Sequence, residues 1–324
     1  MNPLDASQLI QVTADNVSKT GFFCYMSKKK SEGYQRKLQW LEARFAEGLR
    51  IKMLQLPERG FIEYIPGEHA WRAVHADGYL FIHCLWVVGK SKGKGHAAAL
   101  LESCMQDAER MGLRGVAMVC SEKVWMCSRR ILEKHGFTCV DTAQELGRTG
   151  QAPNRQKVEE TGQVPNRQKV EETGQVPNRQ KVEETGQVPN RQKVEETGQV
   201  PNRQKVFSLM VKHTPEAQSA ASALPLPRFA GGWEEKARLC GEGLTVLRSE
   251  QCPYIVDATQ TAVDTAAKLG VRCQVVDLQS RDELMQRSPS PYGVFGLVHN
   301  GELLSYHYLL EKELLPLLSQ AREL

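Results

Sequence analysis

Apolar residues recur at two different periods along the first part of the chain, which predicts alternating strands and helices. The spacing of Leu38, Leu41 and Phe45 predicts an amphipathic helix over residues 33–48. A continuous apolar run at 115–120 is typical of a strand buried on both faces. Further strands are expected at 9–12, 51–56, 60–74, 78–87 and 138–142, and further helices at 97–112 and 124–135. This order predicts an α/β domain.

The last part of the chain shows a second set of alternating elements. Strands are expected at 244–248, 271–278, 297–299 and 303–308, with helices at 254–269 and 281–286. The pair Asn300-Gly301 is the signal of a type I′ hairpin turn. Residues 214–232 are polar and rich in Pro, Ala and Ser, which is typical of a linker. We therefore expect two domains, at 1–213 and 233–324, as the length of 324 residues also favours.

A tandem repeat occupies residues 151–206. The 12-residue unit QVPNRQKVEETG occurs four times, the first copy carrying Ala152, and a fifth copy stops after Val206. Each unit has too little apolar surface to offset the entropy of ordering. We predict a flexible insertion between the strand at 138–142 and a last strand at 207–212, because added loop length costs little stability. Short helical turns or marginal hairpins are the alternative.

Composition and charge narrow the classes of partner. With 41% hydrophobic and 25% charged residues the chain has an ordinary soluble composition, and a net charge of +4 is too small to favour nucleic acid. No signal-peptide pattern and no run of 18 apolar residues occur, so we expect a cytoplasmic protein without membrane association. Nine cysteines without metal-type spacing predict reduced, mostly buried thiols and no metal site.

Candidate chemistry is concentrated at residues 85–101, LWVVGKSKGKGHAAALL. An apolar strand breaks at Gly89 into a loop of glycines and lysines and restarts as an Ala/Leu helix. The first turn of a helix leaves N–H groups unpaired and carries a partial positive charge, so this stretch is a candidate phosphate site. It matches neither the P-loop nor the dinucleotide-binding pattern. The alternative is an ordinary strand-to-helix turn with solvated lysines.

The same stretch resembles the acyl-coenzyme A loop of the GNAT N-acetyltransferase superfamily. Its signature falls on Lys92, Gly95 and Ala97, with lysine where the family has Arg or Gln, and His96 where an apolar residue is usual. The resemblance implies a GNAT-fold mixed sheet with flanking helices and acetyl-CoA as co-substrate. It implies that amides of residues 93–97 bind the pyrophosphate and that the preceding strand pairs with the pantetheine arm. The implied cofactor-binding residues are Leu85, Trp86, Val87, Lys92, Gly93, Lys94, Gly95, His96 and Ala97.

The strand before the loop carries a candidate general base. In the arylalkylamine acetyltransferases of this family a histidine lies two residues before the L-x-V that enters the loop, and here that residue is His83. Imidazole titrates near neutrality, as proton removal from an amine requires. Glu63 and Glu68 are alternative bases, and a hydrogen-bonded core histidine is the alternative interpretation of His83.

The residues leave several candidates for the proton donor. The segment ILEKHGF resembles the closing segment of GNAT domains, in which a tyrosine protonates the departing thiolate, but Leu132 occupies that position here. The remaining candidates for the acid are Cys127, Ser128, Tyr79 or water.

The final domain resembles a small thioredoxin-like domain, specifically the YoaP-like domain found behind some GNAT domains. The resemblance covers most of residues 240–324, with Cys252-Pro253-Tyr254 at the first helix and Pro291, a candidate cis proline, before the third strand. A thiol at a helix N-terminus is favoured as thiolate, so Cys252 is a possible thiol site. Ile255 stands where a dithiol motif has its second cysteine. The alternative is a domain that packs or binds without redox chemistry.

Together these features predict an acetyltransferase that moves an acetyl group from acetyl-CoA to a primary amine of a small molecule, by direct attack in a ternary complex. The segment TGFFCYMSKKK and the tail domain are expected to line the acceptor site. The alternative is a catalytically weak acyl-CoA sensor whose tail domain binds a partner or a thiol. The sequence does not determine the oligomeric state.

Overall fold

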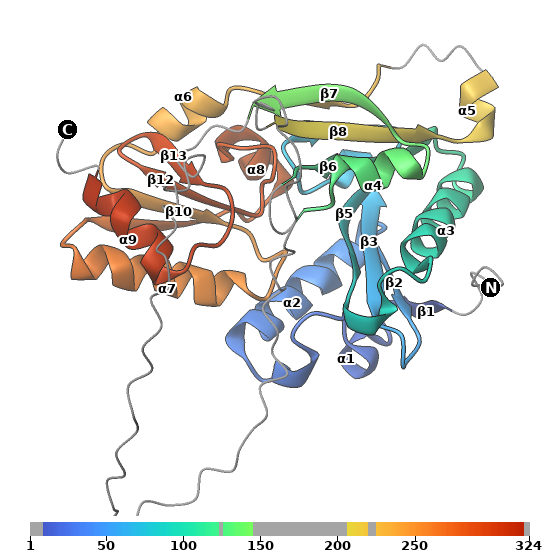
Figure 1. The fold of residues 1–324 in the computed structure, drawn as a ribbon, viewed down its shortest axis with the longest axis horizontal. Coiled ribbons are helices and arrows are strands. Elements are labelled where there is room, and N and C mark those ends of the chain that lie inside the picture. Colours follow the sequence, from blue (N-terminus) through green and yellow to red (C-terminus); the bar gives the residue numbers. More distant parts are fainter. Residues whose placement is uncertain (1–8, 123–125, 145–205, 220–224, 321–324) are drawn as a thin grey trace, which may run out of the picture. The chain divides into compact units, whose positions relative to one another are not determined.

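A seven-stranded mixed sheet organises the first part of the chain. The computed structural model describes residues 9–122, 126–144, 206–219 and 225–320. The strand order is β1-β2-β3-β5-β6-β8-β7, and every neighbouring pair is antiparallel except β5 and β6 (Figure 1). The bounds are β1 Leu9–Val12, β2 Arg50–Leu54, β3 Gly60–Pro66, β5 Leu80–Val87, β6 Gly115–Cys120, β7 Thr138–Gln144 and β8 Val206–His213. The expected mixed α/β sheet is therefore present.

Helices cover both faces of this sheet. On one face, α3 buries Leu100, Leu101 and Cys104 against β3, β5 and β6. On the other face, Trp40 and Leu41 of α2 join a second apolar cluster. The described helical segments that precede β7 are α1 Val17–Thr20, η2 Met26–Lys28, α2 Glu32–Ala46, η3 Gly67–His69, η4 Gly89–Ser91, α3 His96–Arg110 and α4 Arg129–Lys134. The sheet is thus a layer between two apolar clusters, as the buried run of β6 requires.

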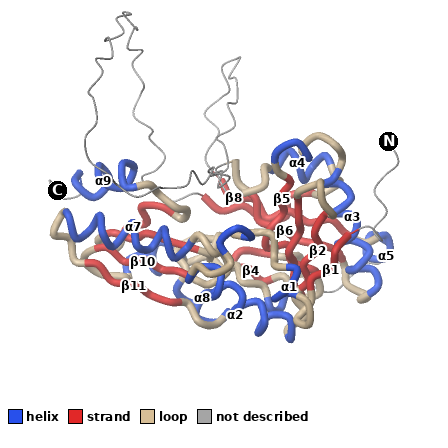
Figure 2. The backbone as a smooth tube through the Cα atoms, turned by 90° about the horizontal axis from the view of Figure 1, so that it is seen from below, coloured by secondary structure: helices blue, strands red, loops and turns tan. Residues whose placement is uncertain are grey.

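A second, four-stranded sheet follows in the order β11-β10-β12-β13. Strands β10 and β11 are parallel, and the other neighbours are antiparallel. The elements are α6 Trp233–Arg238, β10 Leu244–Arg248, α7 Ile255–Lys268, β11 Cys273–Asp277, α8 Arg281–Arg287, β12 Phe295–His299, β13 Glu302–Ser305 and α9 Glu311–Gln320. Figure 2 shows α7 running beside β10 and β11. Asn300 and Gly301 have φ of 50° and 78°, as the predicted hairpin turn requires.

Both sheets belong to one compact unit. The segment expected as a linker carries α5 Pro215–Ser219 and β9 Arg228–Phe229, and β9 pairs with β4 Val74–His75 of the first part. Arg36 on α2 forms an ion pair with Glu250 at 2.9 Å, and the rings of Phe207 and Tyr306 lie 4.7 Å apart. The repeats lie outside the described residues, so their flexibility stays a prediction, as does the division into domains.

Three local expectations are corrected by the structure. The strand expected at 60–74 ends at Pro66, because Gly67 packs against the carbonyl of Ala76 in a 3-10 turn that a side chain would block. The helix expected at 124–135 has its N-cap at Ser128. Pro291 follows a trans bond, and the cis bond within the described residues is Leu56–Pro57. Within the same residues, no helix is both long and apolar enough to cross a membrane.

Candidate functional site

Strand β5 leaves its neighbour β6 halfway along its length. The two strands pair only from Leu80↔Val116 to Ile82↔Met118, whereas β5 pairs with β3 as far as Val87. Residues 83–87 therefore present one edge of backbone N–H and C=O groups that no described strand pairs with. Such an edge is able to bind an extended ligand that carries amide groups.

A β-bulge marks the point where the edge opens. Glu63 is opposite Cys84 and Tyr64 is opposite Ile82, so His83 is the extra residue of β5. A bulge re-aims the side chain that it carries and is common beside active sites. The bulge thus turns His83 toward α2 at the start of the open edge, as its ring contact with Trp40 shows.

The glycine loop continues directly from the open edge. Gly93 and Gly95 have φ of 78° and 83°, which glycine adopts without strain, and a Cβ added at either would meet nothing within 4 Å. No hydrogen bond joins the backbone N–H groups of residues 93–98 to the described part of the chain. Open space above two glycines and unpaired N–H groups at the start of α3 fit the pyrophosphate of a coenzyme A ester.

Charge at the loop is partly neutralised by a residue that the sequence analysis missed. Glu58, between β2 and β3, accepts from Lys94 at 2.6 Å and lies 2.9 Å from Nε2 of His96. The hydrogen bond from Lys94, with further bonds from Ser91 and His96, lowers the pKa of Glu58 to about 2. Lys92, by contrast, forms no ion pair with a described residue, so its charge is available to a phosphate.

The three remaining cofactor-binding residues predicted from the sequence lie on β5 itself. Leu85 and Val87 pack toward the α3 side of the sheet, and Trp86 packs toward the opposite side. Their backbone groups belong to the open edge, so the structure brings the predicted strand and the predicted loop residues together. Their contact with a cofactor stays a prediction.

His83 is enclosed, with 6% of its surface exposed. Its Nε2 accepts a hydrogen bond from the backbone N–H of Trp71 at 3.0 Å, so the proton of the neutral ring is on Nδ1. Nδ1 lies 3.5 Å from the nearer Glu63 oxygen, which is long for a hydrogen bond. Burial lowers the pKa of His83 to about 4. The ring is therefore neutral at pH 7, as a base must be, but its lone pair is engaged by a backbone amide.

Glu63 is paired with a lysine that the sequence analysis did not single out. Nζ of Lys37 on α2 donates to Glu63 at 2.8 Å, and both side chains are buried. Burial alone would raise the pKa of Glu63, but Lys37 and His83 outweigh it and lower the pKa to about 2. Glu63 is consequently an ionised anchor beside His83. Glu68, the other alternative base, is exposed on η3.

Within the described residues, the candidates for the proton donor form no hydrogen bond with Glu63 or His83. Burial raises the pKa of Cys127 to about 12, so it is a neutral thiol, and its Sγ lies 3.7 Å from the carbonyl of Ser128. Tyr79 is fully buried, with its hydroxyl 3.5 Å from Nδ1 of His213. Leu132 is fully buried in the cluster beneath α3. The raised pKa of Cys127 makes it a weaker acid than an ordinary thiol, so donation of its proton to a thiolate would need a further change in its surroundings.

Cys252 lies just before α7, as expected, but its surroundings oppose a thiolate. Burial raises the pKa of Cys252, although the hydroxyl of Tyr308 acts in the opposite direction. Cys24 and Cys84 are close enough to influence one another and Cys252 electrostatically. No group of three His, Cys, Asp or Glu side chains suited to a metal ion occurs in the part of the chain that the structure describes.

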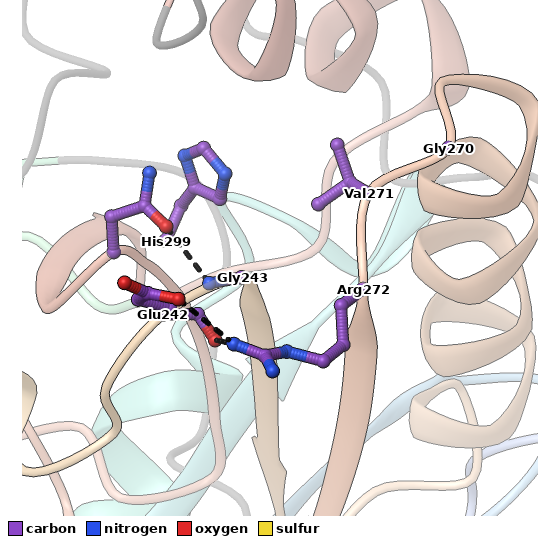
Figure 3. A pocket seen from close by; sticks show the side chains of 7 residues that line it. Glu242, Gly243, Gly270, Val271, Arg272 and His299 are labelled. Carbon is purple, nitrogen blue, oxygen red and sulfur yellow. Dashed lines mark hydrogen bonds and ion pairs between the residues drawn. The ribbon is translucent and has the colours of Figure 1, made fainter.

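A surface hollow of about 580 Å³ lies elsewhere, at one end of the second sheet (Figure 3). It is lined by Glu242, Gly243, Gly270, Val271, Arg272, His299 and Asn300. Arg272 pairs with Glu242 at 3.2 Å across it. None of the residues predicted to bind the cofactor or to take part in catalysis lines this hollow, so it is not part of the candidate site.

Comparison with known proteins bears on the chemistry. No family model matches the chain. Over 303 residues, the chain is 25% identical to the uncharacterized N-acetyltransferase YoaP of Bacillus subtilis (strain 168), and the match covers 93% of this chain and 94% of YoaP. This similarity to YoaP supports the assignment of the chain as a GNAT-type N-acetyltransferase. Because the match extends over nearly all of both chains, the tail is part of the resemblance.

Solved acetyltransferases are loosely similar in structure. The IAA acetyltransferase from Bacillus cereus ATCC 14579 is 10% identical, with 64% of this chain and 98% of that chain covered and a TM-score of 0.32. The ribosomal-protein-alanine N-acetyltransferase from Brucella melitensis is 12% identical, with 64% and 99% covered and a TM-score of 0.34. A proposed streptothricin acetyltransferase from Bacillus anthracis str. Ames, in complex with acetyl coenzyme A, is 13% identical, with 51% and 62% covered and a TM-score of 0.28. No residue role is carried over from likenesses this loose.

Proposed function

We propose that the protein transfers the acetyl group of acetyl-CoA to a primary amine of a small molecule, by direct attack in a ternary complex. The observation that carries the proposal is the unpaired edge of β5 at residues 83–87, which runs directly into the open glycine loop. The edge would bind the amide groups of the pantetheine arm, and the loop would bind the pyrophosphate. A cofactor bound in this way would have its thioester near the bulge at His83.

The chemistry needs a polarised carbonyl, a neutral amine and a proton for the leaving thiolate. A backbone N–H of the open edge at residues 83–87 would polarise the thioester carbonyl. The amine nitrogen forms a bond to the carbonyl carbon, the carbon–sulfur bond breaks, and the proton lost by the amine leaves through a base. A proton delivered to the sulfur completes the exchange.

For the base we propose His83, with Glu63 as the residue that positions it. The neutral ring has its lone pair on Nε2, and the Glu63 carboxylate faces Nδ1 and would stabilise a transient imidazolium. Proton removal would require Nε2 to exchange the Trp71 N–H for a water or for the amine. For the acid we propose Cys127 or a water molecule, with water favoured because burial makes the Cys127 thiol a weak acid.

The tail would complete the acceptor side of this site. Its element order, β10-α7-β11-α8-β12-β13-α9, supports a thioredoxin-like, YoaP-like domain. Gln251, three residues after the end of β10, contacts Arg72 beside the bulge. We propose that this domain contributes to acceptor binding through such contacts.

The second candidate function is an acyl-CoA sensor. It is favoured by one observation, the enclosure of His83 with both ring nitrogens facing protein atoms. A sensor would bind acetyl-CoA at the same edge and loop but would not turn it over with any amine.

The loop assignment is tested by adding a side chain at Gly93. Gly93→Val would fill the space above the loop, and Gly112→Val is the matched control, because both glycines have positive φ and open surroundings at opposite ends of α3. We expect similar small losses of stability from both variants, but loss of coenzyme A binding only from Gly93→Val, measured by calorimetry. Equal affinities in the two variants would remove the loop from the cofactor site.

A further inference from the structure

Arg72 is a buried cation between the two sheets. Only 6% of its surface is exposed. Its guanidinium donates to the carbonyl of Trp71 at 2.7 Å, to the carbonyl of His83 at 2.7 Å and to Oε1 of Gln251. Gln251 is itself fixed, because its Nε2 donates to Oγ of Ser249 at 2.8 Å. The guanidinium is therefore held in one orientation by residues from both sheets.

All three acceptors of Arg72 are neutral. No described carboxylate forms an ion pair with it, although buried charges in proteins are normally paired. Glu63 is a carboxylate that influences Arg72 electrostatically, but Lys37 already pairs with it. With His83 neutral, Lys37 and Arg72 carry two positive charges against one negative charge on Glu63. The cluster thus has an excess of one positive charge away from bulk water.

The remaining hydrogen-bonding capacity of Arg72 fits an anion. A guanidinium has five N–H donors, and bonds to described residues use three of them, two on Nη1 and one on Nη2. The donors left on Nε and Nη2 are able to form a bidentate pair with a planar oxyanion. The ring of Tyr292, 5.3 Å from the guanidinium carbon, adds a cation–π contact but no negative charge.

The position of Arg72 connects this charge with the acyl-transfer site. The His83 carbonyl that it binds belongs to the bulge, where the open edge of β5 begins. An acceptor amine would approach the thioester at this end of the edge. A group bonded to Arg72 would therefore belong to the acceptor, while the phosphates of the cofactor would lie at the other end, on the glycine loop.

We propose that Arg72, oriented by Gln251 of the tail, binds an oxyanion on the acceptor, so that the preferred acceptors are amines that also carry a carboxylate or a phosphate monoester. The proposal rests on the proposed acetyl transfer. It assigns the tail a definite part in specificity, because Gln251 holds the guanidinium without touching the reacting atoms.

The test compares acceptors with and without the anion, and each rate is expressed per neutral amine because removing the anion also lowers the pKa of the amine. Rates with acetyl-CoA are measured for each of the common amino acids against its α-amide, and for O-phosphoethanolamine against ethanolamine. We expect kcat/KM to favour the anionic member by about 10- to 100-fold in the wild type, as a charge-assisted pair typically contributes. A preference among amino acids identifies a carboxylate, and one confined to phosphoethanolamine identifies a phosphate. Equal rates within every pair would overturn the proposal.

Variants of Arg72 and Gln251 distinguish a role in binding the anion of the acceptor from a purely structural role. Arg72→Gln should remove the preference by raising KM for the anionic member alone, and Gln251→Leu should reduce it partly, with unchanged affinity for coenzyme A. Arg72→Lys retains the charge and should retain part of the preference, which keeps the test available if Arg72→Gln does not fold. Equal losses for the anionic and neutral members in a folded variant would assign Arg72 to structure only.

Ligand-binding measurements distinguish a failure of the proposed anion site from a failure of the proposed acetyl transfer. If acetyl-CoA binds but no amine is acetylated, the acetyl-transfer proposal fails. Thermal stabilisation by N-acetyl amino acids and by their amides then still reports on the anion site. Stabilisation by the acids that disappears in Arg72→Gln would support the site, and no difference between acids and amides would overturn it.

Discussion

Replacing His83 with glutamine is expected to remove a pH-dependent part of the protein's stability. Burial lowers the pKa of His83 to about 4, whereas a histidine in an unfolded chain titrates near 6.5. Between these pH values the unfolded chain binds a proton at His83 and the folded chain does not. The contribution is therefore fully present above about pH 6.5 and is lost as the pH falls toward about 4.

The size of the effect follows from the two pKa values. Each pKa unit corresponds to about 1.4 kcal/mol, so a difference of 6.5 − 4 amounts to about 3 kcal/mol, of which about 2 kcal/mol falls between pH 7 and pH 5. Urea unfolding at pH 7 and pH 5 measures it in the wild type, in His83→Gln and in His69→Gln, an exposed histidine.

We expect the wild type and His69→Gln to lose about 2 kcal/mol more free energy of unfolding than His83→Gln between the two pH values. The comparison is of losses within each protein, so a lower starting stability of His83→Gln does not affect it. Equal losses in all three proteins would refute a buried, neutral His83.

Three further changes test other contacts. Lys37→Met leaves a buried carboxylate unpaired and is expected to cost about 3–5 kcal/mol in urea unfolding, whereas adding Glu63→Gln should restore much of it; additive costs would contradict the ion pair. Glu58→Gln releases Lys94 and is expected to tighten coenzyme A binding severalfold at low salt, measured by calorimetry, and unchanged affinity would show that the carboxylate does not compete with the ligand. Cys252 is expected to react with iodoacetamide at pH 7 more slowly than a free thiol, followed by peptide mass spectrometry, because burial raises its pKa; a faster reaction would indicate an activated thiolate.

Local sequence patterns predicted most of the fold. Strand β10 has the expected bounds, Leu244–Arg248, and the buried run of β6 forms a central strand with every residue buried. The glycine loop lies between β5 and α3 as expected, because strand, turn and helix signals there are all local in sequence. Helix α4 begins later than the predicted residue 124, because apolar spacing alone does not locate an N-cap such as Ser128.

The partners of the site residues were not predictable in the same way. Lys37 lies among charged positions of an amphipathic helix and has the pattern of a solvated residue, yet it is buried against Glu63. Glu58 and Arg72 lie in connections between strands, and their contacts with the loop and with Gln251 depend on tertiary packing. The contacts of these three residues form only when distant segments are brought together, and no periodicity in the sequence encodes them.

The central claim is tested most directly by amine-dependent release of coenzyme A from acetyl-CoA. The measurement uses the full chain, a panel of primary amines with and without anionic groups, and detection of the free thiol with mass spectrometry of the acetylated product. We predict saturable release that requires an amine, produces one N-acetyl product per thiol and is abolished in Gly93→Val but not in Gly112→Val. Tight binding of acetyl-CoA without turnover of any amine would contradict an acetyltransferase and favour the acyl-CoA sensor.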